Sequence, residues 1–244
     1  MKYKVHEIKK PIPYELIESG KLVRRQSKDS FNVIEFIIDP INDIESKNFV
    51  EFCKEKTLSM KTNRKNTDSK IRTTKILSKD KYLGVASEYL LTLCINKYFI
   101  KNAIDKITLN PDFIDYNSHV DIAILDKSTE KSKTIELRAS FPYARLDKVI
   151  WYYFDLIGPY TTSYKNYESS KDFYARALIN QKKKNFNFNK KHSIFLTGGA
   201  PFSLFEDYGS YITMGTSANY TVIEPLADSY DIIDFIKMLW IFSI

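Results

Sequence analysis

Two carboxylates, Asp121 and Glu136, lie inside runs of apolar residues that have the composition of buried strands. The runs are His-Val-Asp-Ile-Ala-Ile-Leu at 119–125 and Lys-Thr-Ile-Glu-Leu-Arg-Ala-Ser at 133–140. A carboxylate removed from water costs several kcal/mol unless a cation meets it. The turn-rich loop between the runs favours a hairpin, in which both acids can share one face because side chains alternate along a strand. Neighbouring carboxylates repel unless a cation lies between them, and their hard oxygen atoms suit Mg²⁺.

Two polar side chains follow Glu136 on the same face of the predicted strand, Arg138 and Ser140. A metal ion at the acid pair would lower the pKa of a bound water and hold the phosphoryl oxygens of a substrate. The guanidinium of Arg138 would neutralise charge on the phosphate as water attacks it, and Ser140 could contact substrate or water. The alternative is structural: the acids pair with Arg138, Lys133 or His119. His119 is itself either a proton donor or a polar residue at a strand end.

A third carboxylate, Glu88, falls in the clearest helical stretch of the sequence, 78–100, for which Ser78 is the candidate N-cap. The stretch is apolar on nearly every face, which is typical of a buried helix. Glu88 shares a row with Gly84 and Leu91, so its carboxylate lies among apolar neighbours. The alternative is an ordinary salt bridge, or an early-helix glutamate that the helix dipole stabilises.

In this order, Gly-x-x-x-Glu on a helix, Val-Asp-Ile-Ala-Ile on one strand and Ile-Glu-Leu-Arg on the next, the sequence resembles the PD-(D/E)XK nuclease superfamily, which has the restriction-endonuclease-like fold. The resemblance covers roughly residues 80 to 200. It implies a central mixed sheet flanked by helices and a Mg²⁺-dependent DNA endonuclease in which Mn²⁺ can substitute. It also implies that Glu88 supports the metal site, that Asp121 and Glu136 bind the metal, and that the carbonyl of Leu137 completes its shell.

The sequence departs from the family pattern at Arg138, where the family has lysine. Arginine keeps the positive charge but cannot act as a base, because its pKa is above about 12. Proton removal would then fall to the metal or to a substrate phosphate, and a descendant that has lost catalysis is the alternative. Asp112, which follows Pro111, matches the family name literally, but it lacks the apolar flanks of Asp121 and is the second choice for the metal-binding aspartate.

A basic stretch at 181–192 surrounds Phe186 and Phe188 with lysines. The candidate nucleic-acid contacts here are Lys182, Lys183, Lys184, Lys190 and Lys191. Lysines neutralise phosphates, and exposed aromatic rings stack on bases. The alternative is a surface loop whose phenylalanines fold inward. The polar and basic stretch at 54–81 is likewise either a solvated connector or an arm that contacts phosphates.

The bulk composition limits the classes of protein that the sequence can encode. With 244 residues, 43% of them hydrophobic, the chain suits one large domain, or one domain with a small appendage. The net charge of +7 fits a polyanionic partner without requiring one. Cys53 and Cys94 suggest neither a zinc site nor a disulfide framework, and no signal peptide is visible, so we expect a cytoplasmic protein without a membrane span. The apolar tail 232–244 predicts a buried or dimer-forming helix capped by Ser229 or Asp231.

The hydrophobic pattern predicts a mixed α/β fold with an N-terminal extension. The expected strands are 32–39, 106–116, 119–125, 133–140 and 192–197, the last stopped by Gly198-Gly199; the expected helices are 43–56, 78–100, 145–157, 170–184 and 229–244. Residues 1–76 would form a flank for recognition or dimerisation, and 77–244 a nuclease-like core. The combined prediction is a homodimeric type II restriction endonuclease of a restriction-modification system that cuts double-stranded DNA. Its alternative is a non-catalytic nucleic-acid-binding module on the same fold.

Overall fold

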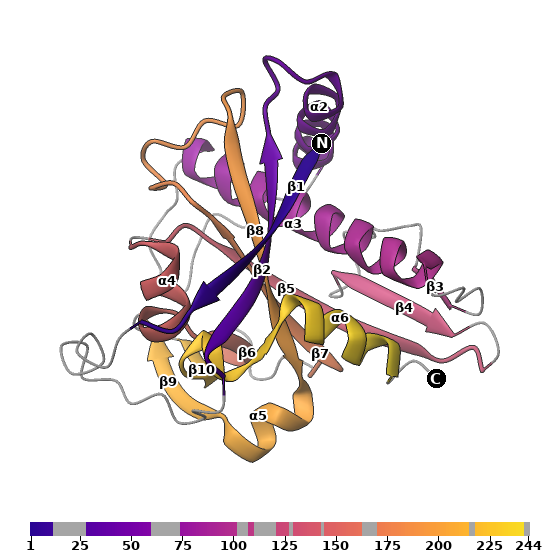
Figure 1. The fold of residues 1–244 in the computed structure, drawn as a ribbon, viewed down its shortest axis with the longest axis vertical. Helices are drawn as coiled ribbons and strands as arrows, with labels where there is room; N and C mark the ends of the chain where they lie inside the picture. Colours follow the sequence, from indigo (N-terminus) through magenta and orange to yellow (C-terminus); the bar gives the residue numbers. More distant parts are fainter. Residues whose placement is uncertain are drawn as a thin grey trace.

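A computed structural model describes nine segments of the chain, and the fold is reported for these alone. The segments are 1–11, 28–59, 74–101, 107–109, 121–126, 129–142, 144–162, 170–214 and 218–241. The structure is a mixed α/β fold with a central mixed sheet flanked by helices, which confirms the predicted fold class (Figure 1).

The main sheet has the strand order β1-β2-β8-β7-β5-β4-β3, and β11 pairs with β8 beside this path. Its strands are β1 (Lys2–Lys9), β2 (Ser30–Ile38), β3 (Ile107–Leu109), β4 (Ile122–Asp126), β5 (Ser132–Ser140), β7 (Phe173–Ile179), β8 (His192–Pro201) and β11 (Tyr230–Asp231). β5 and β7 are parallel, and the other neighbours are antiparallel. A smaller antiparallel sheet contains β6 (Leu156–Thr162), β10 (Ala218–Ile223) and β9 (Ser210–Met214).

Helices cover both faces of the main sheet because its strands carry apolar side chains on both faces. On one face Ile34, Phe36 and Leu137 pack with α2 (Ile44–Ser59), α3 (Thr74–Lys101) and α6 (Ile232–Ile241). On the other, Phe31 and Val33 pack with η1 (Val149–Tyr153), α5 (Phe202–Tyr208) and η2 (Leu226–Asp228). The short α4 (Leu146–Lys148) runs directly into η1. The small sheet and α5 lie at the end of the molecule opposite α2 (Figure 1).

The predicted N-terminal flank is part of the main sheet. β2 pairs with β8 from Ile34 opposite Leu196 to Ile38 opposite His192, and β1 pairs with β2. Phe49 of α2 belongs to the same hydrophobic core as α3 and α6. The boundary predicted at residue 76 therefore does not separate two hydrophobic cores.

The prediction of a helix at 170–184 is wrong, because residues 173–179 form β7. All seven residues of this strand are buried, since it lies inside the sheet between β5 and β8 with packed side chains on both faces. A strand that is covered on both faces loses the alternation of polar and apolar residues that marks a strand in a sequence. The run Ala-Arg-Ala-Leu then has the composition of a helix.

Three predicted element boundaries are also corrected. α3 begins at Thr74, so Ser78 lies inside the helix and does not cap it. β8 continues through Gly198-Gly199 to Pro201 instead of stopping there. The helix predicted at 145–157 is limited to α4 and η1, and β6 follows from Leu156.

The C-terminal helix is confirmed as a buried helix. Asp231 is its cap, because Oδ1 accepts hydrogen bonds from the backbone N–H groups of Ile233 and Asp234, both at 3.0 Å. Its buried residues are Ile232, Phe235, Ile236, Met238 and Leu239. These side chains fill the core under the main sheet, so most of the apolar surface predicted to be free for a dimer is used within the molecule. Among the helices of the described segments, none combines the length and hydropathy that a membrane crossing requires.

Candidate active site

The predicted hairpin is present and brings the first two acids together. β4 and β5 are antiparallel with Ile122 opposite Ile135, which places Asp121 across from Glu136. Asp121 immediately precedes β4, and its Oδ2 accepts a hydrogen bond of 2.7 Å from the backbone N–H of Leu137. The N–H and C=O of one strand residue point toward the same neighbouring strand, so the Leu137 carbonyl also faces the side on which Asp121 lies.

Helix α3 supplies the third acid, Glu88. Burial raises the pKa of Glu88 well above its usual range, and repulsion by Asp121 and then Glu136 raises this pKa further. The three carboxylates predicted from separate segments are therefore electrostatic neighbours. Gly84 lies one turn before Glu88, and a Cβ at position 84 would be in ordinary contact with Glu88 Oε1 at 3.7 Å.

Asp121 is held in conditions that oppose its ionisation. Burial raises its pKa to about 7, and repulsion by Glu136 acts in the same direction. The Leu137 N–H, Arg138 and Lys171 lower this pKa but do not cancel the effect of burial. The site thus gathers three acids beside Arg138 and Lys171, and a bound divalent cation would offset the repulsion that remains between the acids.

Arg138 lies beside the acids but is also engaged by its neighbours. Its Nη2 lies 3.2 Å from Glu136 Oε1, and both side chains are largely buried. The guanidinium carbon is 4.8 Å from the ring centroid of Tyr160 on β6, an arrangement that favours cation–π attraction. The structural alternative, in which Glu136 pairs with Arg138, is thus realised in the same geometry that puts a cation next to the acid pair.

Two cations of this region were not identified in the sequence, Lys171 and Arg176. Lys171 is 5% exposed and lowers the pKa of Asp121. Arg176 is also 5% exposed, and it lies on β7 opposite Arg138 of β5. The Nη2 of Arg176 donates a hydrogen bond of 2.9 Å to Ser140 Oγ, so the predicted contact residue Ser140 belongs to this cluster. Both cations were hidden in the stretch that was assigned to a helix. Reading 173–179 as a strand would have placed Arg176 on one face with Tyr174.

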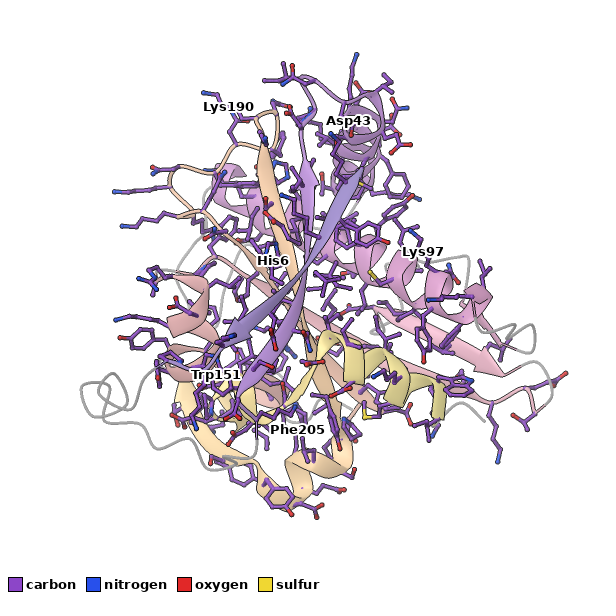
Figure 2. The ribbon with its side chains drawn as sticks, viewed as in Figure 1. His6, Asp43, Lys97, Trp151, Lys190 and Phe205 are labelled. Carbon is purple, nitrogen blue, oxygen red and sulfur yellow. The ribbon has the colours of Figure 1, made fainter. Side chains whose placement is uncertain are left out.

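The lysine-rich loop between β7 and β8 has its phenylalanines folded inward, as in the alternative considered for it. Phe186 is 2% exposed, and Phe188 stacks on Tyr82 with 5.2 Å between ring centroids. Lys183 forms an ion pair with Asp80, with 2.6 Å between Nζ and Oδ1. The exposed lysines of the loop are Lys182, Lys184, Lys190 and Lys191. Lys190 projects from the molecule at the same end as Asp43 (Figure 2). The loop therefore offers exposed charge, while Phe186 is buried and Phe188 partly buried.

Several predicted residues lie outside the described segments. These are Pro111, Asp112 and His119, together with positions 60–73 of the basic stretch at 54–81. The candidate site is therefore built from Glu88, Asp121, Glu136, Arg138 and the residues that contact them.

The donor set fits Mg²⁺ in kind. Within the described segments no three His, Cys, Asp or Glu side chains form a cluster that could hold a metal by themselves. Mg²⁺ is nevertheless usually held by one or two carboxylates, with water and substrate phosphate completing an octahedron. Asp121 and Glu136 can supply that pair, since the hairpin places them opposite each other and the Leu137 N–H holds the Asp121 carboxylate in place.

Comparisons with known proteins add one relative. The chain is similar to "Uncharacterized protein MJECS01" of Methanocaldococcus jannaschii, with 26% identity over 260 aligned positions that cover 93% of this chain and 92% of that protein. No family model matches the chain, and no solved structure matches it. The similarity spans nearly the full length of both proteins, and the relative's name states no activity.

Proposed function

We propose that the chain is a cytoplasmic, Mg²⁺-dependent DNA endonuclease with a restriction-endonuclease-like core, of the type II restriction class. The observation that supports this proposal is the meeting of Asp121, Glu136 and Glu88 beside Arg138. Acids from a helix and two strands share one buried region, although their mutual repulsion is unfavourable. Such an arrangement is typical of a functional site.

Each residue would have a distinct task. Asp121 and Glu136 would hold Mg²⁺ together with the Leu137 carbonyl, and the N–H of Leu137 would fix the orientation of the Asp121 carboxylate. Mg²⁺, when bound, supplies an activated water and neutralises phosphoryl oxygens. Arg138 would stabilise the negative charge that grows on the phosphate, and Glu88 would hold the acid pair in place. Cutting both strands of a duplex would require two such sites, which favours a homodimer.

Removing either metal-binding acid should abolish cutting. Plasmid and phage DNA are incubated with wild type, Asp121→Asn, Glu136→Gln and the control Asp234→Asn, which changes an exposed acid of α6. We expect cutting in Mg²⁺ but not in EDTA, a loss of more than about 100-fold in both site variants, and no loss in the control. Cutting that survives in EDTA, or in both site variants, would contradict the proposal.

A second function, a non-catalytic nucleic-acid-binding module on this fold, is favoured by one observation. Arg138 occupies the position of the family lysine and pairs with Glu136 at 3.2 Å, so no amine stands there that could release or accept a proton. The charge that would bind phosphate is kept in such a module, while catalysis is lost. Binding of DNA without cutting, whichever divalent metal ion is added, would support this second function.

Substitution of Arg138 separates the two functions further. We expect Arg138→Lys to retain cutting, because the ammonium keeps the charge beside the acids, and Arg138→Ala to lose most of it. Initial rates of plasmid cutting in Mg²⁺ are the measurement, with Arg145→Ala, an exposed arginine near α4, as the control. An alanine variant that cuts normally would remove Arg138 from the site.

A further inference from the structure

Two arginines of the central sheet lie directly side by side. β5 and β7 are parallel with Arg138 opposite Arg176, and the alternation of side chains puts both on the face that packs against η1 and the small sheet. Burial lowers the pKa of Arg176 to about 10, and the neighbouring Arg138 lowers it too, while Asp155 opposes this change. A pKa of about 10 leaves Arg176 charged at neutral pH, so the two arginines concentrate positive charge in a region of low exposure.

Arg176 is only partly satisfied by its surroundings. Its Nη2 donates to Ser140 Oγ, and its guanidinium carbon lies 5.2 Å from the ring centroid of Phe154. Its Nε and Nη1 are buried and have no hydrogen-bond partner within the described segments. A buried charged donor without a partner is costly, and a fold rarely keeps one unless something binds there.

We propose that Arg138, Arg176 and Ser140 form an anion site for a phosphate group. The identification of that group as a phosphodiester of DNA rests on the function proposed above; the affinity for phosphate does not. An oxyanion placed between the two guanidiniums relieves their repulsion and accepts hydrogen bonds from Nε and Nη1 of Arg176. Guanidinium is also the cation best shaped to bind phosphate through more than one N–H.

Ser140 extends this site toward solvent. Its hydroxyl accepts a hydrogen bond from Arg176 and is half-buried, so its own proton remains available to a ligand oxygen. Arg138 is the more exposed of the two arginines and lies next to Glu136 on the same strand. A phosphate held here would therefore lie beside the acid pair, where the proposed nuclease must place the bond that it cuts.

The test is carried out in EDTA, so that it does not depend on cutting. The full chain is compared with Arg176→Met, Ser140→Ala and a control, Lys237→Met, which removes one exposed charge from α6 on the other face of the sheet. Two probes are used: the unfolding temperature in inorganic phosphate against chloride of equal ionic strength, and the anisotropy of a labelled DNA duplex.

We expect inorganic phosphate to raise the unfolding temperature of wild type and control but not of Arg176→Met, and Ser140→Ala to show a reduced rise. Without phosphate, Arg176→Met should unfold at the same temperature as wild type or higher, because it removes an unmet buried charge. If the ligand is the DNA backbone, the duplex dissociation constant should also rise about tenfold in Arg176→Met. If the site takes free phosphate only, duplex binding will not change.

Two results would overturn the anion site. One is a phosphate response that is the same in wild type, Arg176→Met and Ser140→Ala. The other is an Arg176→Met variant that unfolds well below wild type without phosphate, which would make Arg176 a structural partner of Asp155. Ser140→Ala, which removes only a hydroxyl, keeps the test decisive if Arg176→Met does not fold. An absence of cutting in Mg²⁺ would refute the nuclease and leave these measurements unaffected.

Discussion

Asp121 shows how single residues make this region unusual. Its carboxylate is partly covered by protein, faces Glu136 across the hairpin, and accepts a backbone hydrogen bond from Leu137. The hydrogen bond fixes its position, whereas burial and the second acid raise its pKa. A side chain that is positioned precisely but ionises reluctantly is suited to a ligand that brings positive charge.

The raised pKa of Asp121 predicts a pH-dependent stability. Between its usual value of 3.8 and about 7 the folded chain binds more protons than the unfolded chain, so the free energy of unfolding falls as the pH rises through this window. Asp121→Asn removes this titration, and we expect the fall between pH 4 and 7 to be smaller by about 1 to 3 kcal/mol. Urea unfolding at several pH values in EDTA measures it, with Asp234→Asn as the control.

Mg²⁺ gives the same prediction a second readout. At pH 7.5 the ion should raise the unfolding temperature of wild type, because it stabilises the ionised acids, and should have less effect on Asp121→Asn. If the free energy of unfolding depends on pH identically in wild type and variant, the titration of Asp121 does not contribute to it.

The acids of the site and Arg138 could be predicted from the sequence, but Lys171 and Arg176 could not. Asp121 and Glu136 are each single charges in an apolar run, and the two-residue period of a strand places both on one hairpin. Lys171 and Arg176 come from a segment whose neighbour is β5, a parallel partner that is distant in sequence. Such a pairing has no local signal, because it depends on which strands the whole chain brings together.

At the scale of elements, the pairing of β11 with β8 depends on two glycines. Gly198 has a φ of +117°, and a Cβ there would lie 2.2 Å from the Tyr230 carbonyl oxygen. A Cβ on Gly199 would lie 2.1 Å from the carbonyl oxygen of Tyr174 on β7. The register of β7 and β8 shifts next to this point, between Arg176 and Ala177. The strand continues here because glycine has no side chain to clash, although the pair looked like a stop in the sequence.

Alanine substitutions should show that a glycine at this strand pairing tolerates a side chain less well than a glycine in a helix. We expect Gly199→Ala to lower the free energy of unfolding by about 3 kcal/mol or more, because backbone atoms of β7 must move. Gly84→Ala is the matched control: its Cβ would meet only Glu88 Oε1 at 3.7 Å, and alanine in a helix interior stabilises by about 0.5–1 kcal/mol. Urea unfolding of both variants is the measurement. Equal changes in the free energy of unfolding would contradict the close approach of β7 to Gly199.

The fold was predictable where a stretch has the clear composition of a strand or helix and ends at a turn signal. β2, β5, α2 and α3 match their predicted stretches to within a few residues. The failures include β7, which is buried along its whole length, and the helix predicted from residue 145, where α4, η1 and β6 are found instead. The strands β1, β9 and β10 were not predicted either. At these positions the tertiary environment decides the local structure.

At the scale of the molecule, a second group of positive charges lies on the loop between β7 and β8. Its exposed lysines are Lys182, Lys184, Lys190 and Lys191. If each contacts a phosphate, replacing all four by glutamine should reduce the slope of log affinity against log salt by about 3 to 4. Duplex anisotropy in EDTA over a range of salt is the measurement.

The control for this experiment has the same change in charge on other elements. Four exposed lysines on α2, α3 and α6 serve for this, Lys47, Lys97, Lys101 and Lys237. If both sets of substitutions reduce the salt slope equally, the loop has no special role and the net charge of the chain explains the binding.

The pairing of β2 with β8 has a consequence for how the protein is made. On the ribosome, β1 and β2 emerge early, but the strand that covers the inner edge of β2 begins only at His192. A two-stranded ribbon alone is barely stable in water. Much of the core into which Phe36 packs belongs to segments that are synthesised later. The nascent chain should therefore expose apolar side chains of β1 and β2 through most of translation, and this segment is where chaperones would be expected to bind.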